Sequence, residues 1–321
     1  MINKMKYFLD LIRYKNLVII ILIQYAIKIC LIDCYLNDSA LSHLDFSIYL
    51  SSLIAIIAGG YIINDIYDIL IDKINKPEKI IIDSKISRIS ALKIYYILNL
   101  IGISGGFYVS SQINKLYFGF IFIFFAFSLF KYSRNYKTTF LIGNLQIAFL
   151  TALSIITLAL FDLIPNGIKQ ENGAEMTFYI ILCYSAFSFI TTLIREIIKD
   201  LEDIEGDKEV DANTFAINIG IEKTKKTIIF LTLTTITPIA YFQYFQYSVL
   251  TSTFSIDLSY WGVNLTSVIY TCIIQILLII LAIKINISNT KLEFYNSSKL
   301  CKIIMLFGIL SIPLFSFLHL N

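Results

Sequence analysis

The sequence predicts an all-α, polytopic membrane protein with about nine transmembrane helices in a single domain. The chain has 321 residues, of which 57% are hydrophobic and only 15% are charged, whereas about 25% of the residues of soluble domains are charged. The apolar runs are spread over the whole length, with no long polar linker between them. We therefore expect residues 1–321 to form one transmembrane domain.

Windows of about 20 apolar residues mark the expected membrane spans. They cover residues 17–33, 48–71, 91–111, 116–132, 139–161, 177–199, 227–248, 263–285 and 301–319. The first span lacks a small-residue cleavage site, so we expect it to be retained rather than removed as a signal peptide.

The basic residues indicate how the helices are oriented. All but three of the 26 Lys and Arg residues fall on one side of the predicted spans, and the exceptions are Lys28, Lys115 and Lys169. Because cytoplasmic loops carry the excess of Lys and Arg, we expect the N-terminus on the cytoplasmic side of the cell (inner) membrane. The net charge of +3 gives no reason to expect nucleic-acid binding. Nothing in the sequence indicates an obligate protein partner.

An acidic stripe ends the second predicted span. In a helix that advances about 100° per residue, Asp65, Asp68 and Asp72 fall within a stripe about 60° wide, and Asn64 lies about 40° beyond it. Like charges at these spacings destabilise an isolated helix by a few tenths of a kcal/mol per pair, and partial burial raises that cost. A bound cation would remove the penalty.

A second acidic stripe ends the sixth predicted span, on the same side. Glu196, Asp200, Asp203 and Asp207 follow at positions i, i+4, i+7 and i+11. We expect this helix to continue beyond the membrane until Gly206 caps it. Its other acidic residues are expected to form a solvated face: Glu202, Glu205 and Glu209. Two acidic helix ends on one side suit Mg²⁺, which prefers oxygen ligands and commonly binds through one or two carboxylates together with phosphates.

Basic residues accompany both stripes. Lys79 follows the first stripe in a polar segment, and Arg134 and Lys137 lie in the loop between the fourth and fifth spans. These cations could bind phosphate oxygens, although positive-inside loops and headgroup anchoring also explain them. Asn144 lies inside the fifth span, where it either contacts a ligand or donates to a neighbouring helix.

A diphosphate and a hydrocarbon chain together match these features. We expect the helices to enclose a central apolar cavity that opens at the cytoplasmic side, under capping segments near residues 72–90 and 200–225. An allylic prenyl diphosphate would place its diphosphate at the stripes and its chain in the cavity. Mg²⁺ and cations would stabilise the leaving diphosphate, and aromatic rings would stabilise the allylic cation.

The stripes also resemble those of a known family. Residues 64–72 are similar to the N-D-x-x-D-x-x-x-D motif of the UbiA-type intramembrane prenyltransferases, and residues 196–203 resemble its second acidic motif, with Glu196 in place of the usual Asp. The likeness spans nearly the whole chain. Residues 195–207 most resemble the digeranylgeranylglyceryl phosphate synthase branch, and residues 75–79 fit that branch's Asn-Arg-Pro-Asp-Arg pattern with Lys replacing Arg twice. Asn213, Phe215 and Ala216 depart from the branch's usual residues.

The resemblance implies an activity and a set of site residues. The implied reaction is Mg²⁺-dependent transfer of a prenyl group, geranylgeranyl in this branch, from a prenyl diphosphate to a membrane lipid acceptor such as geranylgeranylglyceryl phosphate. The implied metal ligands are Asn64, Asp68, Glu196 and Asp200. The implied catalytic residues are Asp65, Asp72, Asp203 and Lys137. The implied contacts to phosphate are Lys79, Arg134, Lys137 and Asn144.

Three other functions remain open. The acceptor could be an aromatic quinone precursor of the hydroxynaphthoate or hydroxybenzoate type. Intramembrane carboxylates also occur in cation-coupled transporters, although the sequence shows no internal repeat beyond the acidic motif. A structural lipid-binding protein would bind a diphosphate without releasing inorganic diphosphate.

Overall fold

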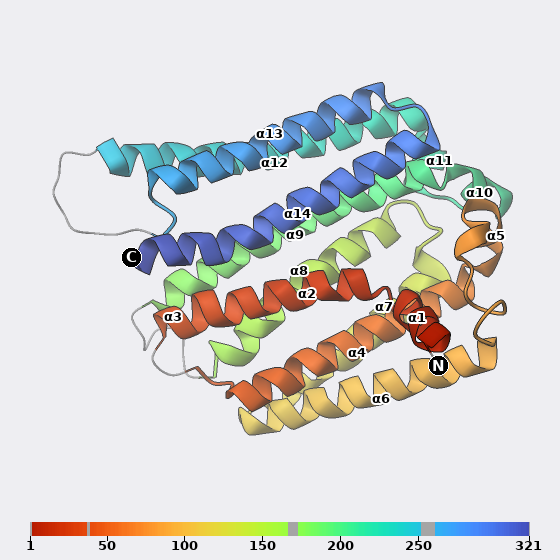
Figure 1. Ribbon diagram of the computed structural model, residues 1–321, viewed down its shortest axis with the longest axis horizontal. Helices are drawn as coiled ribbons and strands as arrows, with labels where there is room; N and C mark the ends of the chain where they lie inside the picture. The colour runs from red at the N-terminus through yellow and green to blue at the C-terminus, as the bar shows by residue number, and fades with distance from the viewer. Residues whose placement is uncertain (1, 37–38, 166–172, 252–260, 321) are drawn as a thin grey trace.

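The computed structural model describes residues 2–36, 39–165, 173–251 and 261–320, and the regular structure in this part of the chain is helical (Figure 1). Nine helices in it are long and apolar enough to cross a membrane. They are Tyr14–Ile27 (α2, continued to Tyr35 by a π-helical turn and α3), His43–Tyr67 (α4), Arg88–Gln112 (α6), Gly119–Lys131 (α7, extended to Leu116–Tyr136 by a 3-10 turn before it and a π-helical turn after it), Ile142–Asp162 (α8), Ala174–Glu202 (α9), Ile221–Thr251 (α12), Leu265–Ile287 (α13) and Lys291–Leu320 (α14). The predicted all-α membrane fold is confirmed.

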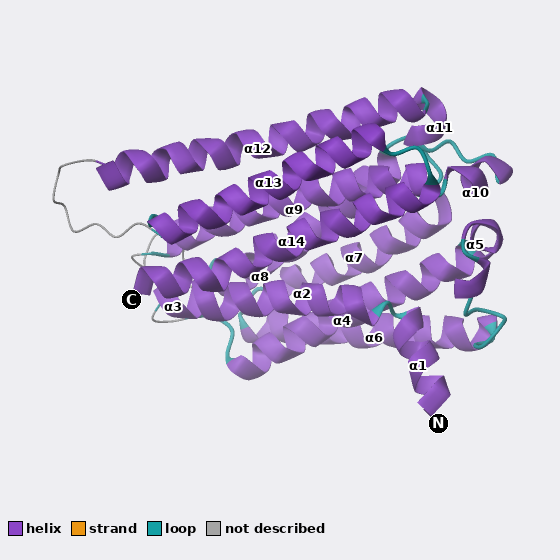
Figure 2. Ribbon diagram, turned by 45° about the horizontal axis from the view of Figure 1, so that its top comes forward, coloured by secondary structure: helices purple, strands orange, loops and turns teal. Residues whose placement is uncertain are grey.

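Four short helices lie at one end of the bundle. They are Ile2–Leu11 (α1), Ile69–Asn75 (α5), Ile204–Glu209 (α10) and Phe215–Ile219 (α11). Figures 1 and 2 show α5, α10 and α11 together at this end, whereas α3 (Asp33–Tyr35) and the C-terminus lie at the opposite end. The two acidic stripes therefore lie at the same end of the molecule, as predicted.

Close helix packing depends on small residues. A Cβ added at Gly102 of α6 would lie 2.8 Å from the backbone oxygen of Ser52 in α4. Small residues at such crossings let helix backbones approach closely within a membrane. Helix α9 contacts α8, α12 and α14, and contributes Ile181 to one buried apolar cluster and Ile194 to another. The second acidic stripe is thus carried by a central helix.

Both acidic stripes are interrupted at equivalent positions. Helix α4 ends at Tyr67, and Asp68 (φ −85°, ψ −1°) joins it to α5. Helix α9 ends at Glu202, and Asp203 (φ −101°, ψ 8°) joins it to α10. The predicted continuous helix up to a cap at Gly206 is therefore wrong.

The side chain of Asn75 explains the second break. It donates to the backbone oxygen of Asp203 at 3.0 Å and accepts from the backbone N–H of Gly206 at 3.1 Å, so α5 binds backbone groups at the start of α10. Gly206 lies inside α10 rather than at its end. A Cβ there would collide with the Asn75 amide. The glycine thus allows two helices to touch, instead of ending one.

The last helix begins ten residues earlier than the expected 301. Its start is fixed by Glu293, whose carboxylate accepts from the backbone N–H groups of Asn289 at 2.7 Å and Thr290 at 2.8 Å. Side-chain acceptors of this kind satisfy the free N–H groups at a helix start. As a result, Lys302 lies well inside α14 and not in a loop.

Candidate active site

The first stripe centres on Asp68. This carboxylate is 3% exposed, and it accepts from both the Asn64 amide and the Lys137 ammonium group. Lys137 follows a π-helical turn, Tyr132–Tyr136, and its backbone N–H donates to the oxygen of Tyr132 at 2.9 Å. The predicted candidate Lys137 is therefore brought to the first stripe by a local helix irregularity, a feature often found at functional sites.

Charges at the helix break alter the titration of their neighbours. Burial lowers the pKa of Lys137, but the Asp68 carboxylate outweighs burial, so the pKa is raised. Burial raises the pKa of Asp72, and the negative charge of Asp68 raises it further. Lys137 thus stays charged, while Asp72 lies where an extra negative charge is unfavourable.

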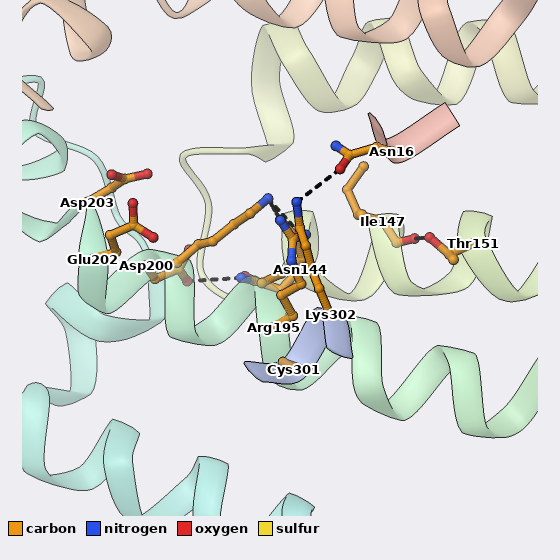
Figure 3. A network of polar contacts seen from close by, with 12 residues as sticks. Asn16, Asn144, Ile147, Thr151, Arg195, Asp200, Glu202, Asp203, Cys301 and Lys302 are labelled. Carbon is orange, nitrogen blue, oxygen red and sulfur yellow. Dashed lines mark hydrogen bonds and ion pairs between the residues drawn. The ribbon is translucent and has the colours of Figure 1, made fainter. Parts of the chain in front are cut away.

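The second stripe is joined to α8 through Asn144. The Asn144 amide donates to an oxygen of Asp200 at 3.0 Å (Figure 3). This contact links two neighbouring helices, which is the role that a buried amide within a span commonly has. It also fixes the carboxylate of Asp200, so Asn144 lies at the site.

Asp207 on α10 lies at the site, although the resemblance did not include it among the implied site residues. It is 5% exposed. Burial raises its pKa to about 6, with Lys137 opposing the rise and the charges of Asp203 and Asp68 adding to it. Asp207 is therefore within electrostatic reach of both stripes. The i+11 spacing from Glu196 was the signal in the sequence, but the helix break changes which members of that stripe converge.

Glu196 is occupied by cations of its own helix. Its carboxylate accepts from Arg195 at 2.8 Å and from Lys199 at 2.8 and 3.0 Å, and it is 7% exposed. A metal ion would have to compete with both cations for these oxygens. The predicted ligand role of Glu196 stays a prediction, and this pairing argues against it.

Asp65 and Asp203 each pair with a cation from another segment. Arg13, just before α2, lies 2.7 Å from Asp65 and covers the ring of Tyr61 at 5.1 Å. Lys76 lies 2.8 Å from Asp203. The sequence indicated neither pairing, since Arg13 was only part of the basic side and Lys76 only part of the pattern at residues 75–79. Their pairing shows that both carboxylates are held in place by cations.

The segments that follow the two acidic stripes contact each other. Lys76 also lies 3.3 Å from Glu202, which is buried, so the expected solvated face is wrong for Glu202 and confirmed for the exposed Glu205 and Glu209. Lys291 of α14 donates to the backbone oxygen of Asn75 at 2.8 Å. Helices α5, α10 and α14 are thus connected by polar contacts around the break in α9.

Arg134 and Lys79 are the remaining predicted contacts to phosphate. Arg134 is exposed, lies over the ring of Phe130 at 5.9 Å, and lines a pocket of about 200 Å³ with Asp68 and Lys137. The side chain of Lys79 lies outside the described residues. The pocket therefore brings two of the predicted cations and one predicted metal ligand together.

The donor set fits a magnesium ion that a phosphate would complete. Asn64 Oδ1 is buried and has no hydrogen-bond partner within the described ranges, an arrangement that costs free energy unless a ligand satisfies it. In the part of the chain that the structure covers, no three His, Cys, Asp or Glu side chains gather closely enough to enclose a metal by themselves. Mg²⁺ usually takes only one or two protein carboxylates beside water and phosphate. Oxygen donors spread over two stripes match that pattern.

The chain is similar to proteins of one known family. The model of the UbiA prenyltransferase family matches residues 34–286. The digeranylgeranylglyceryl phosphate synthase of Sulfolobus acidocaldarius is 38% identical over 173 residues, or 54% of this chain, so the alignment spans only about half (56%) of that relative. The enzyme of the same name from Methanococcus aeolicus is 31% identical over 96% of each chain.

Solved structures share the fold. One, described as giving structural and mechanistic insights into the biosynthesis of digeranylgeranylglyceryl phosphate synthase in membranes, is 25% identical, with a TM-score of 0.62 over 98% of this chain and 99% of that one. A UbiA homologue from Archaeoglobus fulgidus bound to GPP and Mg²⁺ is 15% identical, with a TM-score of 0.56 over 96% of this chain and 99% of its own. The family model and the full-length relative lead to one conclusion: this chain belongs to the UbiA prenyltransferase family.

Proposed function

We propose that the protein transfers a prenyl group, geranylgeranyl, from an allylic prenyl diphosphate to the hydroxyl of a glyceryl phosphate lipid and releases diphosphate. One observation supports this proposal most strongly. Lys137 contacts Asp68 next to the second acidic stripe, at one end of the helix bundle. Relatives named digeranylgeranylglyceryl phosphate synthase support the lipid acceptor.

The proposed metal ligands are oxygen atoms from both stripes. Asn64 and Asp68 would come from the first, and Asp200 and Asp207 from the second. Asp207 replaces Glu196 because the carboxylate of Glu196 is already paired with two cations. When bound, Mg²⁺ supplies positive charge that stabilises the departing diphosphate.

The residues of the chain then have distinct tasks. Lys137 and Arg134 bind diphosphate oxygens, as does Lys79, and Asn144 holds the carboxylate of Asp200 in place. The bond between the allylic carbon and the diphosphate oxygen breaks, and the electron pair leaves with the diphosphate. The acceptor hydroxyl oxygen forms the new bond to that carbon. Its proton passes to the departing diphosphate or to a site carboxylate.

The supporting carboxylates keep the cations oriented. Asp65 holds Arg13, and Asp203 holds Lys76. Asp72, half-buried one turn beyond Asp68, takes part through water or a second metal ion. These three carboxylates therefore position charge around the reacting groups.

The protein is an integral membrane protein, and we infer that the end with the stripes faces the cytoplasm. The loops at this end contain most of the Lys and Arg residues, which cytoplasmic loops retain during insertion. A cytoplasmic opening gives the site access to a diphosphate made in the cytoplasm. The cell (inner) membrane is the proposed location.

A direct acceptor assay tests the proposal. The purified protein, Mg²⁺ and labelled geranylgeranyl diphosphate are incubated separately with geranylgeranylglyceryl phosphate, hydroxynaphthoate and hydroxybenzoate. We expect ether formation with the glyceryl phosphate lipid and release of one diphosphate per product. Transfer only to an aromatic acceptor would overturn the lipid assignment, and cation uptake into vesicles without any transfer would favour a transporter.

A further inference from the structure

Three cations from distant parts of the chain form a second site, next to the acidic stripes. Resting on the proposed function, we propose that Arg13, Arg195 and Lys302 bind the phosphate group of the acceptor lipid. The proposal separates the acceptor phosphate from the donor diphosphate, which lies at Asp68 and Lys137.

The three side chains come from three elements that pack together. Arg13 directly precedes α2, Arg195 lies in α9 and Lys302 lies in α14, and α14 contacts both α2 and α9. Figure 3 shows the nitrogens of Arg195 and Lys302 side by side. The Lys302 ammonium donates to the Asn16 amide oxygen of α2 at 3.0 Å. These three cations and the adjacent Lys199 form a cationic cluster.

The cationic cluster has more positive than negative charge. Its four cations face two carboxylates: Asp65 pairs with Arg13, and Glu196 is shared by Arg195 and Lys199. Among the residues that the structure describes, the ammonium group of Lys302 donates to one partner, the neutral amide of Asn16. An excess of two positive charges at partly buried positions is unfavourable without an anion. A phosphate dianion would neutralise it.

Arg195 has an unused donor in this cluster. Its Nη1 donates to Glu196 at 2.8 Å, but its Nε is buried and finds no hydrogen-bond partner in the described part of the chain. A buried, charged N–H group without an acceptor is costly. Phosphate oxygens match the planar guanidinium fork, which can donate two parallel hydrogen bonds.

The depth of the cluster favours the acceptor over the donor. At 1.5 Å per residue, Arg195 lies about 10 Å before the end of α9 and Asp200 about 3 Å before it. Both carboxylates of the cluster are already paired, so it offers no free oxygen ligands for a metal-bound diphosphate. In a glyceryl phosphate, the reacting hydroxyl is at most two carbons from the phosphate ester oxygen. A phosphate held here would keep that hydroxyl near a donor bound at the stripes.

Steady-state kinetics of Lys302→Gln test the proposal. We expect the KM for geranylgeranylglyceryl phosphate to rise about 10- to 100-fold, because one charged contact to phosphate is lost. The KM for geranylgeranyl diphosphate should stay the same, as should transfer to the dephosphorylated acceptor geranylgeranylglycerol. Lys302→Arg should retain most of the affinity for the phosphorylated acceptor. Lys299→Gln, an exposed lysine on the same helix, is the matched control.

The remaining outcomes separate this proposal from the proposed function. A rise in the KM for geranylgeranyl diphosphate would assign the cluster to the donor and overturn the proposal. If Lys302→Gln lost equal activity with the phosphorylated and the dephosphorylated acceptor, or had the kinetics of the wild type, the proposal would also be overturned. Binding of geranylgeranylglyceryl phosphate is measured separately without a donor: wild type should bind it and Lys302→Gln should bind it weakly. That result would support the site even if no prenyl transfer occurred and the proposed function failed.

Discussion

Two clusters of buried charge lie at opposite ends of the bundle, and among the described residues they differ in how fully they are paired. At the end with α3, the Lys28 ammonium contacts Asp162 at 2.7 Å, Asp33 at 2.9 Å and Ser39 at 2.9 Å. The other oxygen of Asp162 accepts from the backbone N–H of Leu41 at 2.8 Å. The donors and acceptors of this cluster therefore satisfy one another.

At the opposite end, polar atoms remain available. Asn64 Oδ1 and Arg195 Nε are buried without partners within the described ranges, and Lys302 meets only a neutral amide there. A fully satisfied network holds helices together, whereas a partly satisfied one is costly unless a ligand completes it. This difference supports a structural role for the Lys28 cluster and the proposed ligand-binding roles of the stripes and the cationic cluster.

The largest expected effect on stability comes from Lys28→Met. It would leave the Asp162 carboxylate, 0% exposed, without its cation, and removing one partner of a buried pair costs about 3–5 kcal/mol. Thermal unfolding in detergent measures this loss. The double variant Lys28→Met/Asp162→Leu should recover most of the stability. A double variant as unstable as the single one would contradict the structural role of the pair.

The largest expected effect on activity comes from Asp68→Asn. Losing the carboxylate that contacts Lys137 should lower the rate of prenyl transfer by about 10²–10³-fold, the range seen when one stabilising group is removed from an active site. Because Asp68 is buried and paired with Lys137, thermal unfolding is measured alongside, and the rates are compared at a temperature where both proteins are folded. Glu205→Gln, an exposed change on α10, should keep wild-type activity. Normal transfer by Asp68→Asn, assayed with labelled prenyl diphosphate, would refute the proposed ligand set.

A smaller effect is expected from Asp207→Asn, with a dependence on pH. The folded-state pKa of Asp207 is raised from 3.8 to about 6, so folding favours its protonated form. The protonated side chain therefore adds to the stability of the metal-free wild type at low pH, and this stabilisation should be lost as the pH rises through 6. At pH 7.5 the variant should be more stable than the wild type by roughly 1–3 kcal/mol.

Thermal unfolding without Mg²⁺, measured at pH 7.5 and at pH 4, checks this prediction. The difference in stability between Asp207→Asn and wild type should be smaller at pH 4, where Asp207 in the folded wild type is mostly protonated and neutral like the asparagine. A constant difference over this range would contradict the burial of a charged Asp207. The same variant should be less active with Mg²⁺.

The smallest effect is expected from Lys76→Met, which removes the contacts to Glu202 and Asp203. The pair is partly exposed, so the loss should be about 0.5–1 kcal/mol. In Lys76→Met, the backbone amides of α10 should exchange their hydrogens faster than in the wild type, and those of α13 should exchange at the same rate. Unchanged exchange in α10 would mean that Asn75 alone joins α5 to α10.

The sequence predicts the parts of this molecule that depend on local patterns. Nine spans follow from apolar runs, and the resemblance named both Asp68 and Lys137 as site residues, although it did not predict their direct contact. The breaks at Asp68 and Asp203 were not predictable, because they depend on contacts such as that of Asn75 with α10. The Lys28 and Asp162 pair joins residues 134 positions apart, and no local pattern indicates such a partner. Lys302 was missed because its partner Asn16 lies 286 positions away in the sequence, and no local pattern joins the two.

In the proposed site, the two stripes together bind one metal ion and the diphosphate. Electron paramagnetic resonance of Mn²⁺, a stand-in for Mg²⁺, measures binding in the presence of a non-reactive thio analogue of geranylgeranyl diphosphate. We expect Asp68→Asn and Asp200→Asn each to weaken the diphosphate-dependent binding strongly, and the double variant to add little to either, since residues of one site are not additive. Independent, additive losses, or full binding in either single variant, would contradict a shared site.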